Sequence, residues 1–111
     1  MAFVSPRDLT PHELKPGWVA RFFHSDHMTF SYAEVAIGSS VHRHHHPEEE
    51  VWNIIEGDVE FTLGEETRVA RTGDAVVVPS DVAHAATAIS NFRAIIVDYP
   101  IRDAVAGVQT R

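Results

Sequence analysis

Cysteine is absent from the sequence, which excludes disulfides, thiolate nucleophiles and sulfur ligands for a metal ion. Long apolar runs are also absent, since none approaches the roughly 18 residues of a membrane-spanning helix. The first residues include Pro6, Arg7 and Asp8 and lack the apolar stretch of a secretory signal. We therefore expect a cytoplasmic protein with no membrane association.

Positive charge is scarce. The chain has 9 Lys and Arg against 16 Asp and Glu, which gives a formal net charge of -7. An acidic surface repels a phosphate backbone, so we expect no nucleic-acid partner. A length of 111 residues is enough for one domain and too short for two, and an apolar content of 44% is enough for an ordered core. We expect a single domain over residues 1–111.

Helical periodicity is missing, apart from one candidate turn over Arg102–Val105. Pro6, Pro11 and Pro16 predict an extended N-terminal arm over residues 1–17, which could lie across the domain or across a neighbouring subunit. After the arm, short runs rich in β-branched and aromatic residues recur at the spacing of a β-sandwich or barrel. The predicted strands are Met28–Ile37, Val51–Ile55, Val59–Leu63, Thr67–Arg71, Ala75–Val78 and Arg93–Tyr99. Ala75–Val78 is apolar throughout, as in a strand buried on both faces.

Histidine is abundant and clustered. The chain has 8 histidines, and the tract around His44 and His46 is followed by Pro47 and Glu50. Side chains alternate along a strand, so His44 and His46 point the same way. Pro47 ends that strand, and Glu50 can face the same space where the next one begins. His84, after a predicted strand and turn, is the candidate for a further ligand.

These residues resemble the two motifs of the cupin superfamily. The first motif matches at every spacing, with Gly38, His44 and His46, Glu50 and Gly57. In the second motif Gly73, Pro79 and His84 match, whereas Asp81 replaces a glycine and Ala88 replaces an asparagine. Aspartate tolerates left-handed backbone better than most residues, so the turn at Asp81 should survive. The resemblance covers roughly residues 28–102.

The cupin resemblance implies an all-β fold, the double-stranded β-helix or jelly-roll barrel, with one divalent metal ion inside. It implies His44, His46, Glu50 and His84 as the ligands. Imidazole and carboxylate suit Fe, Mn, Ni or Zn. An octahedral ion would keep two open positions, enough for a bidentate anionic small molecule. Surrounding histidines, including His42 and His45, are expected outside the ligand set.

The stretch from His27 to Asp103 is similar to the small cupins of pectin and alginate breakdown, which convert unsaturated monouronates into a linear keto form. Those chains end in a pattern Asp-x-Phe-Ser-Pro-x-Arg. Here Pro100 and Arg102 match, whereas Ile96 stands in place of the acid and Asp98 in place of the phenylalanine. The resemblance implies metal-dependent isomerisation or ketonisation of a small sugar acid. Asp98, or else Glu34, would move the proton, and Arg102 would hold the substrate carboxylate.

Two other functions stay open from the sequence. An iron-dependent dioxygenase could use the same ligands, with the open positions taken by substrate and dioxygen. A metal-bearing cupin could also bind a small molecule without turnover. For each function we expect a homodimer, because pairing between subunits covers exposed edge strands.

Overall fold

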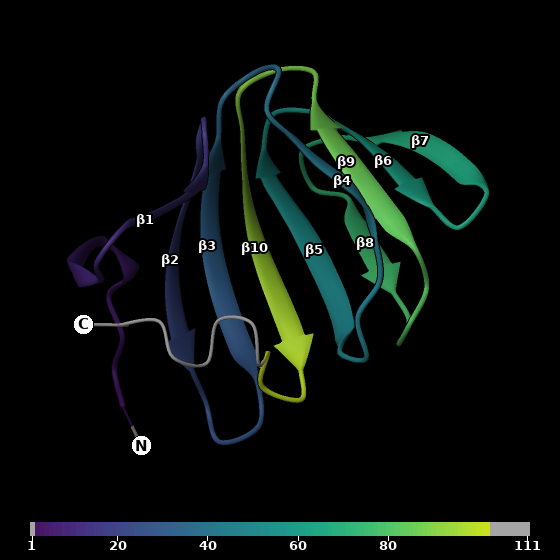
Figure 1. Cartoon of the computed structure of the whole chain (residues 1–111). Coiled ribbons are helices and arrows are strands. Elements are labelled where there is room, and N and C mark those ends of the chain that lie inside the picture. The colour runs from purple at the N-terminus through teal and green to yellow at the C-terminus, as the bar shows by residue number, and fades with distance from the viewer. Residues whose placement is uncertain (1, 103–111) are drawn as a thin grey trace.

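The computed structural model describes residues 2–102 and shows two antiparallel β-sheets packed face to face (Figure 1). One sheet has six strands in the order β1-β2-β3-β10-β5-β8, and the other has four in the order β4-β9-β6-β7. The strands are β1 (His12–Lys15), β2 (Trp18–His24), β3 (Thr29–Val35), β4 (Ser40–His44), β5 (Glu49–Glu56), β6 (Val59–Leu63), β7 (Glu66–Ala70), β8 (Ala75–Val78), β9 (His84–Ala88) and β10 (Phe92–Tyr99). This is the predicted all-β jelly roll. No helix within residues 2–102 is long and apolar enough to cross a membrane.

The core lies between the two sheets and is built around aromatic side chains. Trp52 of β5 meets Trp18 and Phe61 edge-on, with ring centroids 5.8 and 5.1 Å apart. Trp18 also meets Phe92 edge-on at 6.1 Å. Such perpendicular pairs are favoured by the charge distribution of aromatic rings. The polar site described below adjoins this core, since Trp52 also bonds Glu50 of that site.

Alternation along β3 decides the place of Glu34, which the sequence offered as the second candidate for proton transfer. Thr29 and Ser31 are buried, whereas the Glu34 side chain is 56% exposed and pairs with Arg21 at 3.3 Å. The outer face of this sheet has aromatic residues of its own, so aromatic content did not mark the inner face. The role of Glu34 as a pocket residue is therefore corrected, since its carboxylate lies on the outside of the sheet.

The prediction that Ala75–Val78 is buried on both faces is wrong. Val78 is fully buried, but Val77 is 52% exposed. These residues form β8, which lies at the end of the six-stranded sheet and pairs with β5 alone among the described strands. One face of β8 packs on the core, and nothing in the described chain covers the other.

The N-terminal arm is extended, as predicted, and part of it joins the sheet. A short 3-10 turn over Pro6–Asp8 precedes β1, which pairs antiparallel with β2. The turn before β9 also forms as predicted, because Asp81 adopts a φ of 62°. The candidate helical turn over Arg102–Val105 falls outside the described residues, apart from its first residue.

Candidate metal centre

The four predicted ligands meet where the chain passes from one sheet to the other. His44 ends β4 and lies opposite His84, the first residue of β9, in the four-stranded sheet. His46 lies in the connection between β4 and β5, and Glu50 follows near the start of β5 in the six-stranded sheet. One Nε2 or Nδ1 atom from each of the three histidines lies within 4.8 Å of the others. Residues 40 positions apart thus share one small volume.

Each of the three histidines is oriented by a backbone carbonyl two residues away along the chain. A carbonyl oxygen only accepts, so each ring must carry its proton on Nδ1 and leave Nε2 with a free lone pair. The Nδ1–H groups donate as follows: His44 to the oxygen of His42 at 2.7 Å, His46 to that of Glu48 at 3.0 Å, and His84 to that of Val82 at 2.9 Å.

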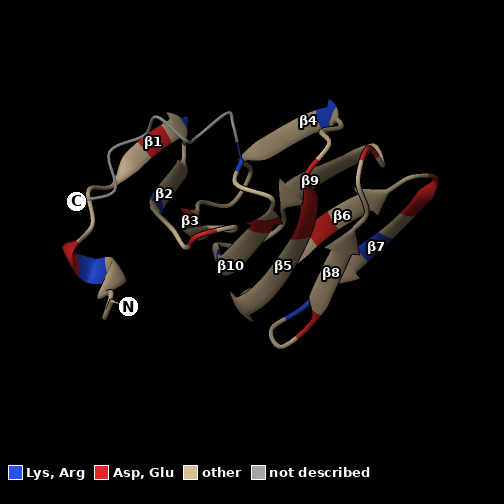
Figure 2. Ribbon diagram, turned by 90° about the horizontal axis from the view of Figure 1, so that it is seen from below, with Lys and Arg blue, Asp and Glu red and all other residues tan. Residues whose placement is uncertain are grey.

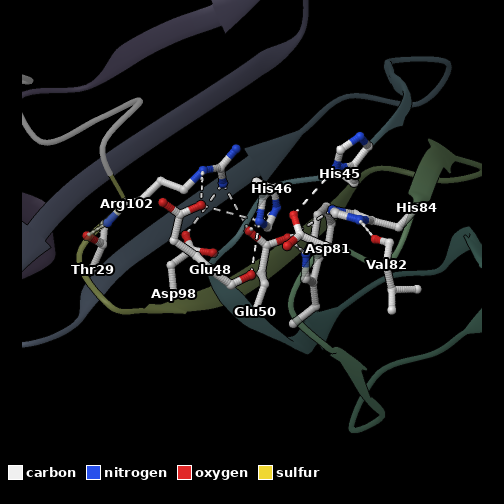
Figure 3. Close-up of polar contacts among 11 residues, drawn as sticks. Thr29, His45, His46, Glu48, Glu50, Asp81, Val82, His84, Asp98 and Arg102 are labelled. Carbon is white, nitrogen blue, oxygen red and sulfur yellow. Dashed lines mark hydrogen bonds and ion pairs between the residues drawn. The ribbon is translucent and has the colours of Figure 1, made fainter.

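The free Nε2 atoms fit a metal ion. The Nε2 atoms of His46 and His84 are buried and have no hydrogen-bond partner. Each lies 3.5 Å from an oxygen of Glu50, and the side chains of these three residues are almost wholly buried (Figure 3). Unpaired buried nitrogen atoms are costly unless something binds them. Three imidazoles and one carboxylate with this orientation form a donor set that suits a divalent transition metal.

Glu50 is the most strongly held group of the site. The indole N–H of Trp52 donates to Oε1 at 2.6 Å, and Nη1 of Arg102 donates to Oε2 at 3.1 Å. Burial alone would raise the pKa of Glu50, but the neighbouring side chains of His46, His84, Asp98 and Trp52 outweigh it and hold this pKa well below its usual range. Glu50 is therefore ionised and available as a ligand.

Asp98 lies directly across from Glu50 in the pairing of β10 with β5, and it is 3% exposed. Figure 2 shows the acidic segments of these two strands side by side. Burial and the neighbouring Glu50 carboxylate raise the pKa of Asp98 to about 9. Asp98 is thus protonated at neutral pH, and its Oδ1 is buried without a hydrogen-bond partner. A buried carboxyl group with a raised pKa therefore lies beside the candidate ligand Glu50.

The pKa values of His44 and His46 are shifted in opposite directions. The Glu50 carboxylate beside its Nε2 raises the pKa of His46. Burial lowers the pKa of His44, which lies closer to the cavity described below. Metal binding needs both rings neutral, so protons compete with the metal most strongly at His46.

Arg102 meets a cluster of carboxylates that belong to the chain itself. Its guanidinium lies 3.7 Å from Glu48, 3.1 Å from Glu50 and 3.7 Å from Asp98 (Figure 3). Its backbone N–H donates to the hydroxyl of Thr29 at 2.9 Å. The role of Arg102 in holding a substrate carboxylate stays a prediction, since these contacts already occupy two of its nitrogen atoms.

Two buried residues of the site, Glu48 and Thr29, had no predicted role. Glu48 is 5% exposed and its backbone oxygen orients His46. Thr29 is fully buried, and its hydroxyl lies 2.9 Å from Nδ1 of His24 as well as bonding Arg102. Glu48 had an ambiguous strand phase after Pro47, and no sequence signal marked Thr29. His45 points outward, as predicted, and pairs with Asp81 at 3.5 Å.

A cavity of about 140 Å³ opens beside the candidate ligands. His44 and Glu50 line it on one side, and Asp98 and Arg102 line it as well. The remaining wall is mostly apolar and includes part of the N-terminal arm: Leu14, Lys15, Trp18, Phe22, Ser31, Val41, Trp52 and Ile96. A small organic molecule entering this cavity would meet the candidate ligands His44 and Glu50, the carboxyl group of Asp98 and the guanidinium of Arg102.

The family profile of the cupin domain matches residues 31–99. The chain belongs to the cupin family. The matched segment contains the three histidines, Glu50 and Asp98, and it ends before Arg102. No curated protein matches the chain.

Solved cupin structures have the same fold. KdgF from a Halomonas species has 22% sequence identity and a TM-score of 0.89, over 95% of this chain and 98% of its own. An RmlC-like cupin from Shewanella frigidimarina has 18% identity and a TM-score of 0.89, over 96% of each chain. A predicted oxalate decarboxylase from Thermotoga maritima has 18% identity and a TM-score of 0.80, over 89% of this chain and 99% of its own. At such identities the likeness shows the fold.

Proposed function

We propose that this cupin is a metal-dependent enzyme that isomerises or ketonises a small sugar acid of the uronate type. The observation that carries the proposal is the pairing of two features at one cavity. Nitrogen atoms of three histidines lie within 4.8 Å of one another, ionised Glu50 lies 3.5 Å from two of them, and protonated Asp98 lies next to Glu50. The resemblance of residues 27–103 to uronate-ketonising cupins supports the same substrate class.

The chemistry needs a group that releases a proton to carbon. Ketonisation of an unsaturated uronate opens the hemiacetal ring: the ring C–O bond at the anomeric carbon breaks, and the anomeric hydroxyl loses its proton and becomes an aldehyde. One carbon of the double bond gains a proton and the other, which bears the former ring oxygen, becomes a carbonyl, so the reaction is an isomerisation overall. A divalent metal ion, when bound, would supply Lewis acidity toward the substrate oxygens. Asp98 holds its proton at neutral pH and lines the cavity, so it can act as the acid. Asp98 thus stands in for the acid that relatives have at the position of Ile96.

Arg102 and Glu50 keep Asp98 in place for this role. Arg102 touches both carboxyl groups, at 3.7 Å from Asp98 and 3.1 Å from Glu50. Burial and the ionised Glu50 raise the pKa of Asp98, and the Arg102 guanidinium acts in the opposite direction without reversing the shift. Apolar residues such as Trp18 and Ile96 line the same space.

The test is the loss of the double-bond absorbance of freshly generated 4,5-unsaturated uronate monomers. Metal-loaded protein should accelerate this decay over the spontaneous rate, whereas metal-free protein and Asp98→Asn should not. The matched control is Asp81→Asn, an exposed aspartate outside the cavity, which should keep full activity. Equal rates with metal-loaded and metal-free protein would contradict the proposal.

The apolar wall of the cavity favours a second candidate, an iron-dependent dioxygenase of a small organic compound. The same four ligands suit iron, with dioxygen and substrate at the open positions. Consumption of dioxygen that requires iron and is not supported by zinc would favour this function. Thermal stabilisation by a ligand without turnover would instead indicate a non-catalytic binding protein.

We also propose that the protein acts in the cytoplasm as a homodimer. Apolar side chains on three adjoining strands of the six-stranded sheet are exposed: Ile55 at 42%, Val77 at 52% and Tyr99 at 55%. Covering such residues is a usual reason for subunits to pair. A monomeric mass in solution at micromolar concentration would contradict the dimer.

A further inference from the structure

The N-terminal arm contributes a cation to the cavity. Lys15 is the last residue of β1, and both Leu14 and Lys15 line the cavity that His44 and Glu50 border. β1 lies at the outer end of the six-stranded sheet (Figure 1), so one wall of the cavity comes from outside the 31–99 segment that defines the family. Lys15 is also the only lysine in the sequence.

The two cations of the cavity differ in their partners. Arg102 contacts the carboxylates of Glu48 and Glu50 and the carboxyl group of Asp98. The ammonium of Lys15 instead lies 5.8 Å from the ring centroid of Trp18, which lines the same cavity. Among residues 2–102 no ion pair joins Lys15 to a carboxylate. A cation held against an aromatic face keeps its charge for an incoming anion, since the ring binds it without neutralising it.

We propose that Lys15 binds the carboxylate of the substrate, and that the arm thereby sets specificity for small acids over neutral sugars. This inference rests on the proposed function for its substrate class, a monomeric sugar acid. It also explains how an anion can be bound although Arg102 is occupied. The metal site would take other oxygens of the molecule, and Lys15 would hold the carboxylate on the side of the arm.

The single lysine allows a direct test of contact. Reductive methylation with carbon-13 labels the Lys15 amine and the N-terminal amine, and it preserves the charge of both. Galacturonate, a saturated uronate, should shift the Lys15 methyl signal in the zinc-loaded protein. Galactose, which has the same ring arrangement without a carboxylate, should leave it in place. No shift with galacturonate at any soluble concentration would overturn the proposal.

Variants then test whether the contact contributes to affinity. Lys15→Met keeps an unbranched stem of similar length and removes the charge, and it should weaken galacturonate binding about tenfold, as expected for one charge-assisted contact. Lys15→Arg should stay within about threefold of the wild type. Arg68→Met removes the same charge from a side chain that is 79% exposed on β7, and it should leave galacturonate affinity unchanged. Zinc affinity should be equal in all four proteins.

The outcomes separate this inference from the proposed function. If unsaturated uronates are not turned over but galacturonate binding still depends on Lys15, the reaction is wrong and the carboxylate site stands. If turnover is found and Lys15→Met leaves both KM and galacturonate affinity unchanged, the reaction stands and Lys15 has no part in it. If KM of Lys15→Met rises about tenfold with little change in kcat, both the proposed reaction and the role of Lys15 are supported.

Discussion

The two sides of Glu50 are built in different ways. On one side lie His46 and His84, whose rings are fixed by carbonyls only two residues away in the chain. On the other side lies Arg102, which reaches Glu50 across 52 residues and bonds Thr29 across 73. The histidine side has buried nitrogen atoms without partners, whereas the arginine side has most of its charges paired within the chain. The histidine side therefore has donor atoms left for a metal ion, whereas the charges on the arginine side are mostly paired within the chain.

The largest expected effect is on the histidine side. His84→Ala removes one of three converging Nε2 atoms, so zinc affinity should fall on the order of 100-fold or more, as measured by competition with a chelating dye. The matched control is His45→Ala, in the same histidine tract but 68% exposed and turned away from the site. Equal zinc affinity in His84→Ala and the wild type would show that these rings do not form the metal site.

On the arginine side the largest effect should come from Asp98, and it depends on pH. Its folded pKa is about 9 and its ordinary value is 3.8, so the folded state keeps a proton that the unfolded state has released over this range. The metal-free protein should therefore lose stability as pH rises, by up to about 1.4 kcal/mol per unit and a few kcal/mol between about pH 5 and about pH 8. The free energy of unfolding of Asp98→Asn, measured by denaturant unfolding, should fall much less over that pH interval. Parallel pH profiles for the two proteins would contradict a protonated Asp98.

A smaller effect is expected at Thr29. Thr29→Val keeps the shape and removes the hydroxyl that bonds the backbone of Arg102 and the ring of His24. The free energy of unfolding should drop by about 1–3 kcal/mol, because these partners are left unpaired in a largely buried place. Zinc affinity should change little, since backbone carbonyls and not Thr29 orient the three candidate ligand histidines. A loss of zinc binding as large as that of His84→Ala would mean that the two sides are not separable.

The smallest effect is expected at Glu34. Its exposed pair with Arg21 lies on the outer face of the sheet, so Glu34→Gln should change the free energy of unfolding by less than about 1 kcal/mol. Turnover of unsaturated uronates, if present, should be unchanged. A large loss of activity in Glu34→Gln would restore the sequence-based role of this residue.

The sequence predicted best where contacts are local. The spacing of His44, His46 and Glu50 follows from strand alternation and one proline, so it is visible along the chain. The left-handed turn at Asp81 was predictable for the same reason, because it depends on one residue and its neighbours. The cupin fold followed from motifs made of such local features.

The arginine side could not be predicted in the same way. Asp98 meets Glu50 only through the register of β10 on β5, and no local signal fixes that register. The sequence left open which face of β3 carries Glu34, because both faces of the strand carry apolar side chains. The place of Lys15 on the cavity wall depends on how the arm pairs with β2, which is also a long-range feature.

The most direct test of the metal centre is a long-range proton–nitrogen NMR spectrum of the histidine rings before and after one equivalent of zinc. The structure predicts that His44, His46 and His84 carry their protons on Nδ1. On addition of zinc their three Nε2 signals should move strongly, while their Nδ1 signals and those of the other histidines stay near their places. Movement of the Nδ1 signals, or binding through His42 and His45 instead, would contradict the account.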